Sequence, residues 1–246
     1  DHKILKLNPN YSWNYCETCK LIFIKVINKK HKMFKNKLKM FNSFEKSKFS
    51  KEFIFIFNKA KNLTNLNNKK WLDFGCGPGN ELNYVKSQKI QCIGYEPNKK
   101  LLEKCRKKDL KVTNQIQNLK GNYDIIFTRN TFKYVDNFPK IFSKLSKLLK
   151  KNGLLIWRDK YFDYMPLKVS MNDIKESMVT STFLRKDSIN NYLKILNYEI
   201  NFCRFYLDNS FLIIATKKLK KKQSDFKLNS SNLHLYENKL IFRVVF

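Results

Sequence analysis

The chain has 246 residues, and its hydrophobic content of 43% is enough for the core of one α/β domain of roughly 200 residues plus an appendage. No apolar run approaches the roughly 18 residues of a membrane-spanning helix, and the N-terminus holds no secretory signal pattern, so we expect no membrane span and a cytoplasmic location. The formal net charge of +30 would suit nucleic acid or other anionic partners, but only six of the 50 basic residues are arginine, and lysine spread over every segment is also typical of a solvated surface.

Residues 1–69 are predicted to form an N-terminal appendage. They contain the CxxC pair Cys16 and Cys19, followed by a strand-like run and then a lysine-rich region. Helical spacing is strongest around Phe49, Phe53 and Ile56. Two thiolates at CxxC spacing supply half of a tetrahedral zinc site, and the printed sequence has no second CxxC.

From Trp71 onward, short apolar strands alternate with amphipathic helices, a pattern typical of a parallel sheet covered on both faces. The predicted strands are 70–74, 89–96, 110–114, 123–128, 154–158, 198–206 and 210–218, and the last two form a hairpin. Helices are predicted over 81–87, from a cap at Asn98, over 137–153 with Gly153 past its end, and from Asp187 or Ser188 to Asn197. We therefore predict a Rossmann-like, doubly wound α/β domain over residues 70–217, with a mostly parallel seven-stranded sheet.

Two further segments have weaker patterns, and the remaining cysteines are scattered. Residues 159–186 have no clear period, and an insertion above strand ends commonly forms a substrate lid. Residues 218–246 form a basic C-terminal tail. The cysteines inside the domain stand singly in apolar or glycine-rich runs and are expected to be buried free thiols: Cys76, Cys92, Cys105 and Cys203.

The turn after the first strand, WLDFGCGPGN, holds three of the chain's six glycines. Such a turn lets a ligand lie against bare backbone at the carboxyl edge of a parallel sheet. A dinucleotide site requires G-x-G-x-x-G, whereas the spacing here is G-x-G-x-G, and Pro78 removes a backbone donor. The pattern therefore disfavours a pyrophosphate cradle and favours a nucleoside without phosphate.

Two acidic residues beside the turn fit such a ligand. Glu96 ends the second strand 21 residues after Gly75, close to the roughly 20 expected for an acid that accepts hydrogen bonds from ribose hydroxyls. Asp73 adds a negative charge beside the turn, suited to an ammonium group.

With these motifs the sequence resembles the class I S-adenosylmethionine-dependent methyltransferases. LDFGCGPGN matches their first motif, IGYEPN the acidic ribose-binding motif and YDIIF the fourth. The likeness runs from about Trp71 to Lys217, and the LLKKNGLLIW passage is typical of the small-molecule branch. The resemblance implies S-adenosylmethionine as cofactor.

The resemblance also assigns residues. It implies that Gly75, Cys76, Gly77 and Gly79 border the methionine part, that Glu96 holds the ribose and that Asn114 flanks the adenine; Asp73 and Arg129 complete the predicted cofactor-binding set. Where the small-molecule branch commonly has Glu-His after the fourth strand, this chain has Lys133 and Tyr134. Candidates for a catalytic base or substrate clamp lie on loops predicted to rim the site: Tyr134, Asp136, Asp159, Tyr161 and Asp163.

Three functions remain open at this stage. A small-molecule methyltransferase is favoured, and the context of Cys16 and Cys19 resembles the latter half of the zinc ribbon in methyltransferases that act on sugars, whose first CxxC would fall just upstream of Asp1. The acceptor would then be a sugar or nucleotide-sugar, whose phosphates suit the basic surface. An RNA methyltransferase is favoured by the charge but lacks the Asn/Asp-Pro-Pro-Tyr/Phe signature after the fourth strand. A non-catalytic partner protein is kept open by the Lys133-Tyr134 departure.

Overall fold

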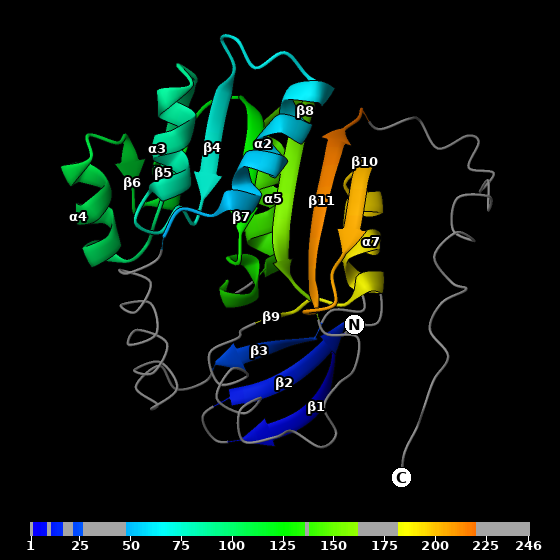
Figure 1. Cartoon of the computed structure of the whole chain (residues 1–246). Coiled ribbons are helices and arrows are strands. Elements are labelled where there is room, and N and C mark those ends of the chain that lie inside the picture. The colour runs from blue at the N-terminus through cyan, green and yellow to red at the C-terminus, as the bar shows by residue number, and fades with distance from the viewer. Residues whose placement is uncertain are drawn as a thin grey trace.

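The computed structural model describes residues 2–8, 11–16, 22–26, 48–135, 138–161 and 182–219. Its main feature is a seven-stranded sheet in the order β10-β11-β8-β7-β4-β5-β6 (Figure 1). The strands are β4 (Lys70–Phe74), β5 (Gln91–Tyr95), β6 (Val112–Thr113), β7 (Tyr123–Arg129), β8 (Leu149–Lys160), β10 (Tyr198–Phe205) and β11 (Ser210–Lys217). Strand β11 is antiparallel to both of its neighbours, and the remaining strands run parallel to one another. The predicted mostly parallel, seven-stranded Rossmann-like sheet is confirmed.

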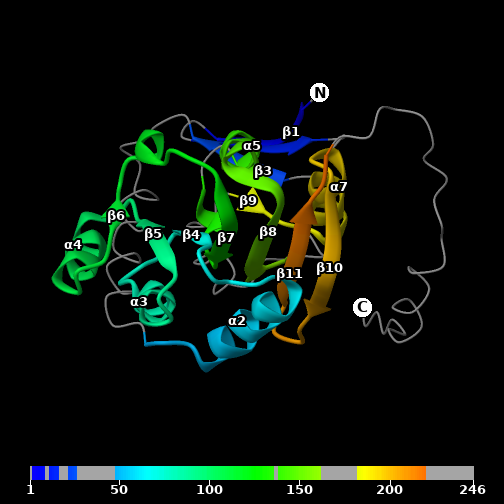
Figure 2. The ribbon, with the colours of Figure 1, turned by 90° about the horizontal axis from the view of Figure 1, so that it is seen from above.

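Helices cover both faces of this sheet. They are α2 (Lys51–Leu63), α3 (Asn80–Ser87), α4 (Lys99–Lys107), α5 (Phe138–Leu148) and α7 (Lys186–Ile195), with short 3-10 turns η2 (Ile116–Asn118) and η3 (Phe132–Tyr134). Figure 2 shows α2 and α3 along one face, and α5 and α7 along the other. None of the helices in the described ranges is long and apolar enough to cross a membrane.

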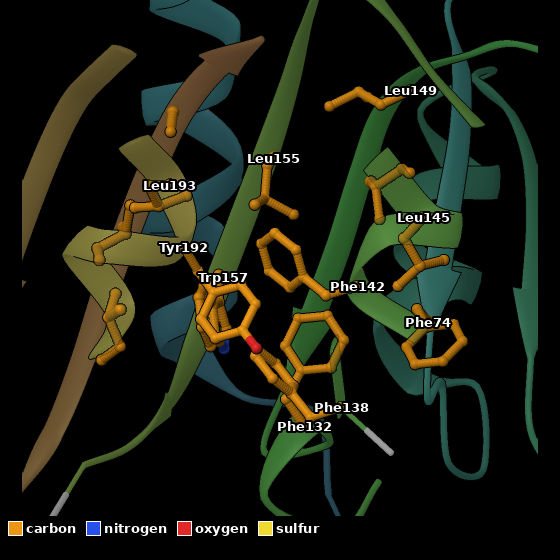
Figure 3. Packing of buried hydrophobic residues seen from close by; sticks show 14 of the residues in the cluster. Phe74, Phe132, Phe138, Phe142, Leu145, Leu149, Leu155, Trp157, Tyr192 and Leu193 are labelled. Carbon is orange, nitrogen blue, oxygen red and sulfur yellow. The ribbon is translucent and has the colours of Figure 1, made fainter. Parts of the chain in front are cut away.

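Successive residues of the central strands point into two separate cores. Trp71 and Ile125 pack on the α2 face, whereas the next residues along each strand, Leu72 and Ile126, pack on the α5 face. This alternation follows from the period of two in a strand, and it explains why the central strands read as continuous apolar runs. On the α5 face a cluster of aromatic rings fills the space between helix and sheet, including Phe132, Phe138, Phe142, Trp157 and Tyr192 (Figure 3).

Helix α2 is packed into the α2-face core, although it precedes the residue at which the methyltransferase-like domain was predicted to begin. Phe53 and Ile56 have no exposed surface. The ring centroid of Phe53 lies 5.0 Å from that of Phe127 and 6.2 Å from that of Trp71. The predicted division at residue 70 therefore crosses a packed contact between a helix and the sheet.

One predicted helix cap is confirmed, and two other element ends differ from the prediction. The Asn98 side chain accepts hydrogen bonds from the backbone N–H groups of Lys100 (2.9 Å) and Leu101 (3.3 Å), which confirms the predicted cap of α4. Helix α7 begins at Lys186, slightly before the predicted start. Helix α5 ends at Leu148, and Gly153 lies inside β8 rather than between helix and strand. Glycine fits this position because an added Cβ would lie 2.9 Å from the Asp124 carbonyl oxygen on neighbouring β7.

A second sheet, in the order β1-β2-β3-β9, contains β1 (His2–Asn8), β2 (Tyr11–Cys16), β3 (Ile22–Val26) and β9 (Thr182–Phe183). In Figure 1 it lies below the carboxyl ends of the parallel strands. Strand β9 pairs with β3, and the Thr182 hydroxyl donates to the Val135 carbonyl oxygen at 3.1 Å. Most of the predicted lid (162–181) and nearly all of the predicted tail (220–246) lie outside the described residues.

Candidate active site

The glycine turn lies between β4 and α3 and is fastened to the end of β5. The backbone N–H groups of Gly75 and Cys76 both donate to the Tyr95 carbonyl oxygen, at 2.8 and 3.1 Å. The N–H of Gly79 closes the turn by donating to the Cys76 carbonyl oxygen at 3.0 Å. All three glycines of the turn have positive φ, a conformation that side chains with a Cβ disfavour.

The glycines differ in what surrounds them. A Cβ on Gly75 would lie 2.1 Å from the Thr131 hydroxyl oxygen, and one on Gly79 would lie 2.5 Å from a methyl of Leu110. A Cβ on Gly77 would have no heavy atom within 4 Å, and this residue lines a cavity. Neighbouring side chains therefore explain the first two glycines, whereas Gly77 presents bare backbone to open space.

The cavity has a volume of about 480 Å³ and lies at the carboxyl ends of β4, β5 and β7. Its apolar wall comes from Phe74, Tyr95, Pro97, Leu101, Ile116, Phe127, Val135 and Ile141. Its charged lining residues in the described part of the chain are Asp73, Glu81, Glu96 and Arg129. A concave site of this size, with an apolar wall and a few polar groups, is typical of a small-molecule or cofactor site.

Glu96 is fixed by two backbone hydrogen bonds. Its Oε2 accepts from the N–H of Gly77 at 2.9 Å, and its Oε1 accepts from the N–H of Asn98 at 2.8 Å. Burial raises the pKa of Glu96, and these two hydrogen bonds partly oppose that shift. Each carboxylate oxygen keeps a further lone pair, so the side chain can also accept two hydroxyl groups of a ligand.

The remaining charged groups of the cavity favour a positively charged ligand. Arg129 Nη2 lies 2.6 Å from Glu81 Oε1, so these two residues form an ion pair. Burial, followed by the charge of Glu81, raises the pKa of Asp73 well above its usual value. Because the cavity lining carries three carboxylates and one guanidinium, a ligand with a positive charge near Asp73 would relieve the electrostatic cost of the site.

Comparison with known proteins identifies the family. A profile described as a methyltransferase domain matches residues 31–200, more than half of the chain. The chain belongs to this methyltransferase domain family. A protein from Haemophilus influenzae whose printed name is "Uncharacterized protein" is 32% identical over 115 residues, which cover 40% of this chain and 45% of that protein. The match therefore spans less than half the length of that relative.

Solved structures of methyltransferases share the fold of this domain. A SAM-dependent methyltransferase from Archaeoglobus fulgidus has a TM-score of 0.54 at 16% identity, covering 72% of this chain and 99% of that chain. A SAM-dependent methyltransferase from Thermotoga maritima, described as a possible histamine N-methyltransferase, has a TM-score of 0.53 at 17% identity, covering 76% and 100%. At such identities the likeness concerns the fold alone.

In this methyltransferase domain, the structure brings most predicted cofactor-binding residues to one cavity. Its lining includes Asp73, Gly75, Cys76, Gly77, Glu96 and Arg129. Gly79 and Asn114 are not among the lining residues: Gly79 precedes the first residue of α3, and Asn114 follows the end of β6. The adenine role predicted for Asn114 stays a prediction, and Ile116, two residues further on, lines the cavity instead.

The predicted catalytic residues fall in different places. Tyr134 lines the cavity, and the Lys133 ammonium lies 4.9 Å from its ring centroid. Asp159 is fully buried; its Oδ2 accepts from the N–H of Phe132 at 3.0 Å and so fixes the η3 turn that carries Tyr134. Tyr161 is buried with its ring edge-on to that of Phe205, and neither it nor Asp159 is among the cavity-lining residues. Their chemical roles stay predictions, and Asp136 and Asp163 lie outside the described residues.

The predicted zinc half-site is only partly described. The backbone of Cys16 ends β2, and Cys19 lies outside the described residues. Among the side chains that the structure does describe, no group of three or more His, Cys, Asp or Glu is placed to hold a metal ion. Zinc at Cys16 and Cys19 therefore stays a prediction.

Sequence reasoning missed three polar residues of the cavity, Glu81, Asn130 and Thr131. An acid in the first turn of a helix is common because it complements the helix dipole, so Glu81 carried no distinctive signal. Its position directly after the glycine turn was the available clue, because the first turn of that helix faces whatever the turn holds. Thr131 had no signal, since its contact with Gly75 joins residues that are distant in the sequence.

Proposed function

We propose that the chain binds S-adenosylmethionine in this cavity and transfers its methyl group to a small-molecule acceptor, a sugar or nucleotide-sugar. The observation that carries the proposal is the open backbone at Gly77 next to the doubly anchored carboxylate of Glu96. S-adenosylmethionine supplies a methyl group on a positively charged sulfur, from which a nucleophile can take it.

The cavity residues fit the parts of this cofactor. Glu96 would accept the two ribose hydroxyls, and the wall formed by Pro97, Leu101 and Ile116 would flank the adenine. Asp73 would face the positive charge of the ammonium group, and Arg129 would hold the carboxylate. No phosphate is needed, in agreement with the lack of a G-x-G-x-x-G turn.

Orientation and exclusion of water are the main tasks of the protein in methyl transfer. The apolar wall serves the second task. Tyr134 is the residue best placed to contact the acceptor, because it lines the cavity on the η3 turn, whose Phe132 N–H donates to Asp159. A base is required only where the acceptor must lose a proton, and Tyr134 is our candidate for that role.

Two observations favour a small-molecule acceptor over RNA. Strand β7 continues into Arg129, Asn130 and Thr131, without the Asn/Asp-Pro-Pro-Tyr/Phe signature of many nucleic-acid methyltransferases. Only six of the 50 basic residues are arginine, the side chain suited to bidentate recognition of phosphates and bases.

Calorimetry with S-adenosylhomocysteine tests the cofactor assignment. We expect wild-type protein to bind, and Glu96→Ala to bind at least about tenfold more weakly, a loss of about 1.4 kcal/mol, since a charged acceptor of two hydroxyls is removed. Glu103→Ala is the matched control, because this acid on α4 is exposed and pairs with Arg106. Equal affinity of wild type and Glu96→Ala would contradict the ribose assignment.

The acceptor is tested separately by a screen for methyl uptake from labelled cofactor. Nucleotide-sugars, free sugars and RNA are offered to the same protein preparation. Label in a sugar supports the proposal, and label in RNA would support the RNA methyltransferase instead. Uptake by none of them, with S-adenosylhomocysteine still bound, would favour a non-catalytic partner protein.

A further inference from the structure

Two buried thiols face each other behind the glycine turn. Cys76 belongs to the turn and Cys105 to α4, and their sulfur atoms lie 4.0 Å apart. Both residues are buried, with 4% and 0% of their surface exposed. Cys76 also lines the cavity, so the pair lies directly behind the cavity wall.

The surroundings hold the two sulfur atoms together. Cys105 Sγ donates to the Gly77 carbonyl oxygen at 3.2 Å. Glycines stand where a side chain would displace a thiol: a Cβ on Gly94 would lie 2.6 Å from Cys76 Sγ, and one on Gly79 would lie 2.9 Å from Cys105 Sγ. Packing therefore places the thiols side by side, close to the backbone that borders the proposed cofactor.

We infer that Cys76 and Cys105 are a modification site, at which hydrogen peroxide forms a disulfide that weakens cofactor binding. In this step two S–H bonds and the O–O bond of the peroxide break, and one S–S bond and two molecules of water form. The two sulfurs are oxidised by two electrons in total, and the peroxide is reduced by the same two. The effect on the cofactor rests on the proposed function, whereas formation of the disulfide does not.

The chemistry of the pair favours Cys105 as the nucleophile. A hydrogen bond from the Cys76 thiol lowers the pKa of Cys105; burial and the charge of Glu96 oppose the shift, and the Lys108 ammonium adds to it. The same hydrogen bond and burial raise the pKa of Cys76 well above its usual value. Because the thiolate is the reactive form, the two thiols differ in the way that disulfide formation requires.

Formation of the disulfide must move the glycine turn. An S–S bond is about 2.05 Å long, so the sulfurs must approach by about 2 Å within a close-packed interior. Cys76 is bonded through its N–H to Tyr95, and the next residue, Gly77, through its N–H to Glu96. A shift of Cys76 toward α4 therefore displaces the backbone that Glu96 and the cofactor share.

Linkage adds a reciprocal expectation. If the disulfide weakens S-adenosylhomocysteine binding by some factor, bound S-adenosylhomocysteine disfavours the disulfide by the same factor. The ligand should therefore protect the thiols through this coupling.

The test uses the full chain with Cys16→Ser and Cys19→Ser, which removes the CxxC pair as a competing disulfide. Protein is treated with hydrogen peroxide with and without S-adenosylhomocysteine, then digested without reduction and mapped by mass spectrometry. Affinity for S-adenosylhomocysteine is measured by calorimetry before oxidation, after oxidation and after dithiothreitol. We expect a Cys76–Cys105 linked peptide, less of it when the ligand is present, an at least about tenfold loss of affinity on oxidation, and recovery on reduction.

Two variants make the result specific. Cys105→Ser keeps a donor for the Gly77 carbonyl oxygen, so we expect it to bind before oxidation and to be insensitive to peroxide. Cys203→Ser changes a half-buried thiol on β10 and should oxidise and lose affinity like its parent. Absence of the linked peptide overturns the inference, and so does a linked peptide with unchanged affinity. If the reduced protein does not bind S-adenosylhomocysteine, the proposed function and the effect on the cofactor both fail, while the linked peptide still decides whether the modification site exists.

Discussion

Asp73 is a buried carboxylate that shares the cavity with Glu81 and Glu96, and burial raises its pKa. A carboxyl whose pKa is raised on folding favours folding at low pH, and this contribution is lost as the pH rises through the folded pKa. At neutral pH Asp73 therefore lowers the stability of the protein, and we interpret this cost as a consequence of placing a carboxyl where a positively charged ligand group would bind.

Asp73→Asn should stabilise the protein and weaken cofactor binding at the same time. At about pH 7 we expect the free energy of unfolding to rise by at least about 1 kcal/mol, since one pKa unit corresponds to about 1.4 kcal/mol. The gain should vanish toward about pH 4, where the native carboxyl is protonated. Chemical unfolding at both pH values and calorimetry with S-adenosylmethionine provide the measurements.

Asp124 provides the control of opposite sign. Burial would raise its pKa, but the Lys70 N–H and the Lys150 ammonium hold it below the usual value. Asp124→Asn should therefore lower the free energy of unfolding at neutral pH, and the loss should fade as the pH falls through the folded pKa. A gain in stability for Asp124→Asn, or a loss for Asp73→Asn at about pH 7, would contradict the electrostatic account.

Gly75 and Gly77 should respond differently to alanine. At Gly77, where φ is +56°, the new methyl group projects into open space, so we expect a folded protein about 1–2 kcal/mol less stable, with at least about tenfold weaker S-adenosylhomocysteine binding. At Gly75 the methyl group also collides with Thr131, so the loss of stability should be larger, by about 1–3 kcal/mol. Thermal unfolding and calorimetry separate the two effects, and wild-type affinity in Gly77→Ala would contradict the assignment of the turn.

At this scale the sequence predicted residues whose position follows from the chain itself. Glu96 could be predicted because a βαβ unit fixes the distance from the glycine turn to the end of the next strand. Asp159 could be placed at a strand end but not oriented: its carboxylate turns inward to the Phe132 N–H, and side-chain direction at the end of a strand depends on neighbours remote in sequence.

Among the elements, α2 had a readable helical period but no readable partner. Its spacing of apolar residues predicted a helix with one apolar face, and the structure buries Phe53 and Ile56 of that face against the sheet. Which surface receives an amphipathic helix depends on tertiary packing, so the helix was assigned to the appendage. Strands β4, β7 and β8 were predictable because burial on both faces makes them continuous apolar runs.

Removal of the Phe53 ring tests how far α2 belongs to the domain core. Phe53→Ala should lower the free energy of unfolding by about 3–5 kcal/mol, because the cavity it leaves is lined by rings of the central strands. Phe55→Ala is the control, because Phe55 lies on another face of α2 and is 38% exposed. It should lower the free energy of unfolding by about 1 kcal/mol or less. Urea unfolding measures both, and equal costs would place α2 outside the cooperative unit.

On the scale of the whole molecule, binding that depends on the net charge of +30 can be distinguished from binding in the cavity by its salt dependence. Binding of an RNA oligonucleotide through surface lysines should fall steeply, by about a thousandfold or more, between about 50 and 200 mM salt. S-adenosylhomocysteine affinity should change by less than about threefold, because buried charges are screened little. Fluorescence anisotropy and calorimetry measure the two, and RNA affinity that persists at high salt would favour the RNA methyltransferase.

The topology of the main sheet was predictable because each βα unit can be recognised from the spacing of its apolar residues and from its turn residues. The pairing of β9 with β3 was not, since a strand of two residues has no period and its partner lies about 160 residues away. Short pairings between distant segments depend on the assembled fold, and local patterns carry no information about them.

Strand β9 has a consequence for how the molecule transmits force. Its backbone is hydrogen-bonded to β3 of the small sheet, while the Thr182 hydroxyl donates to the carbonyl oxygen of Val135, the residue after the turn that carries Tyr134. A displacement of the small sheet is therefore transmitted to the η3 turn through β9, which is only two residues long. The amino-terminal strands are thus coupled to the wall of the cavity. Truncating them would make that wall more mobile, although none of the residues described as lining the cavity would be removed.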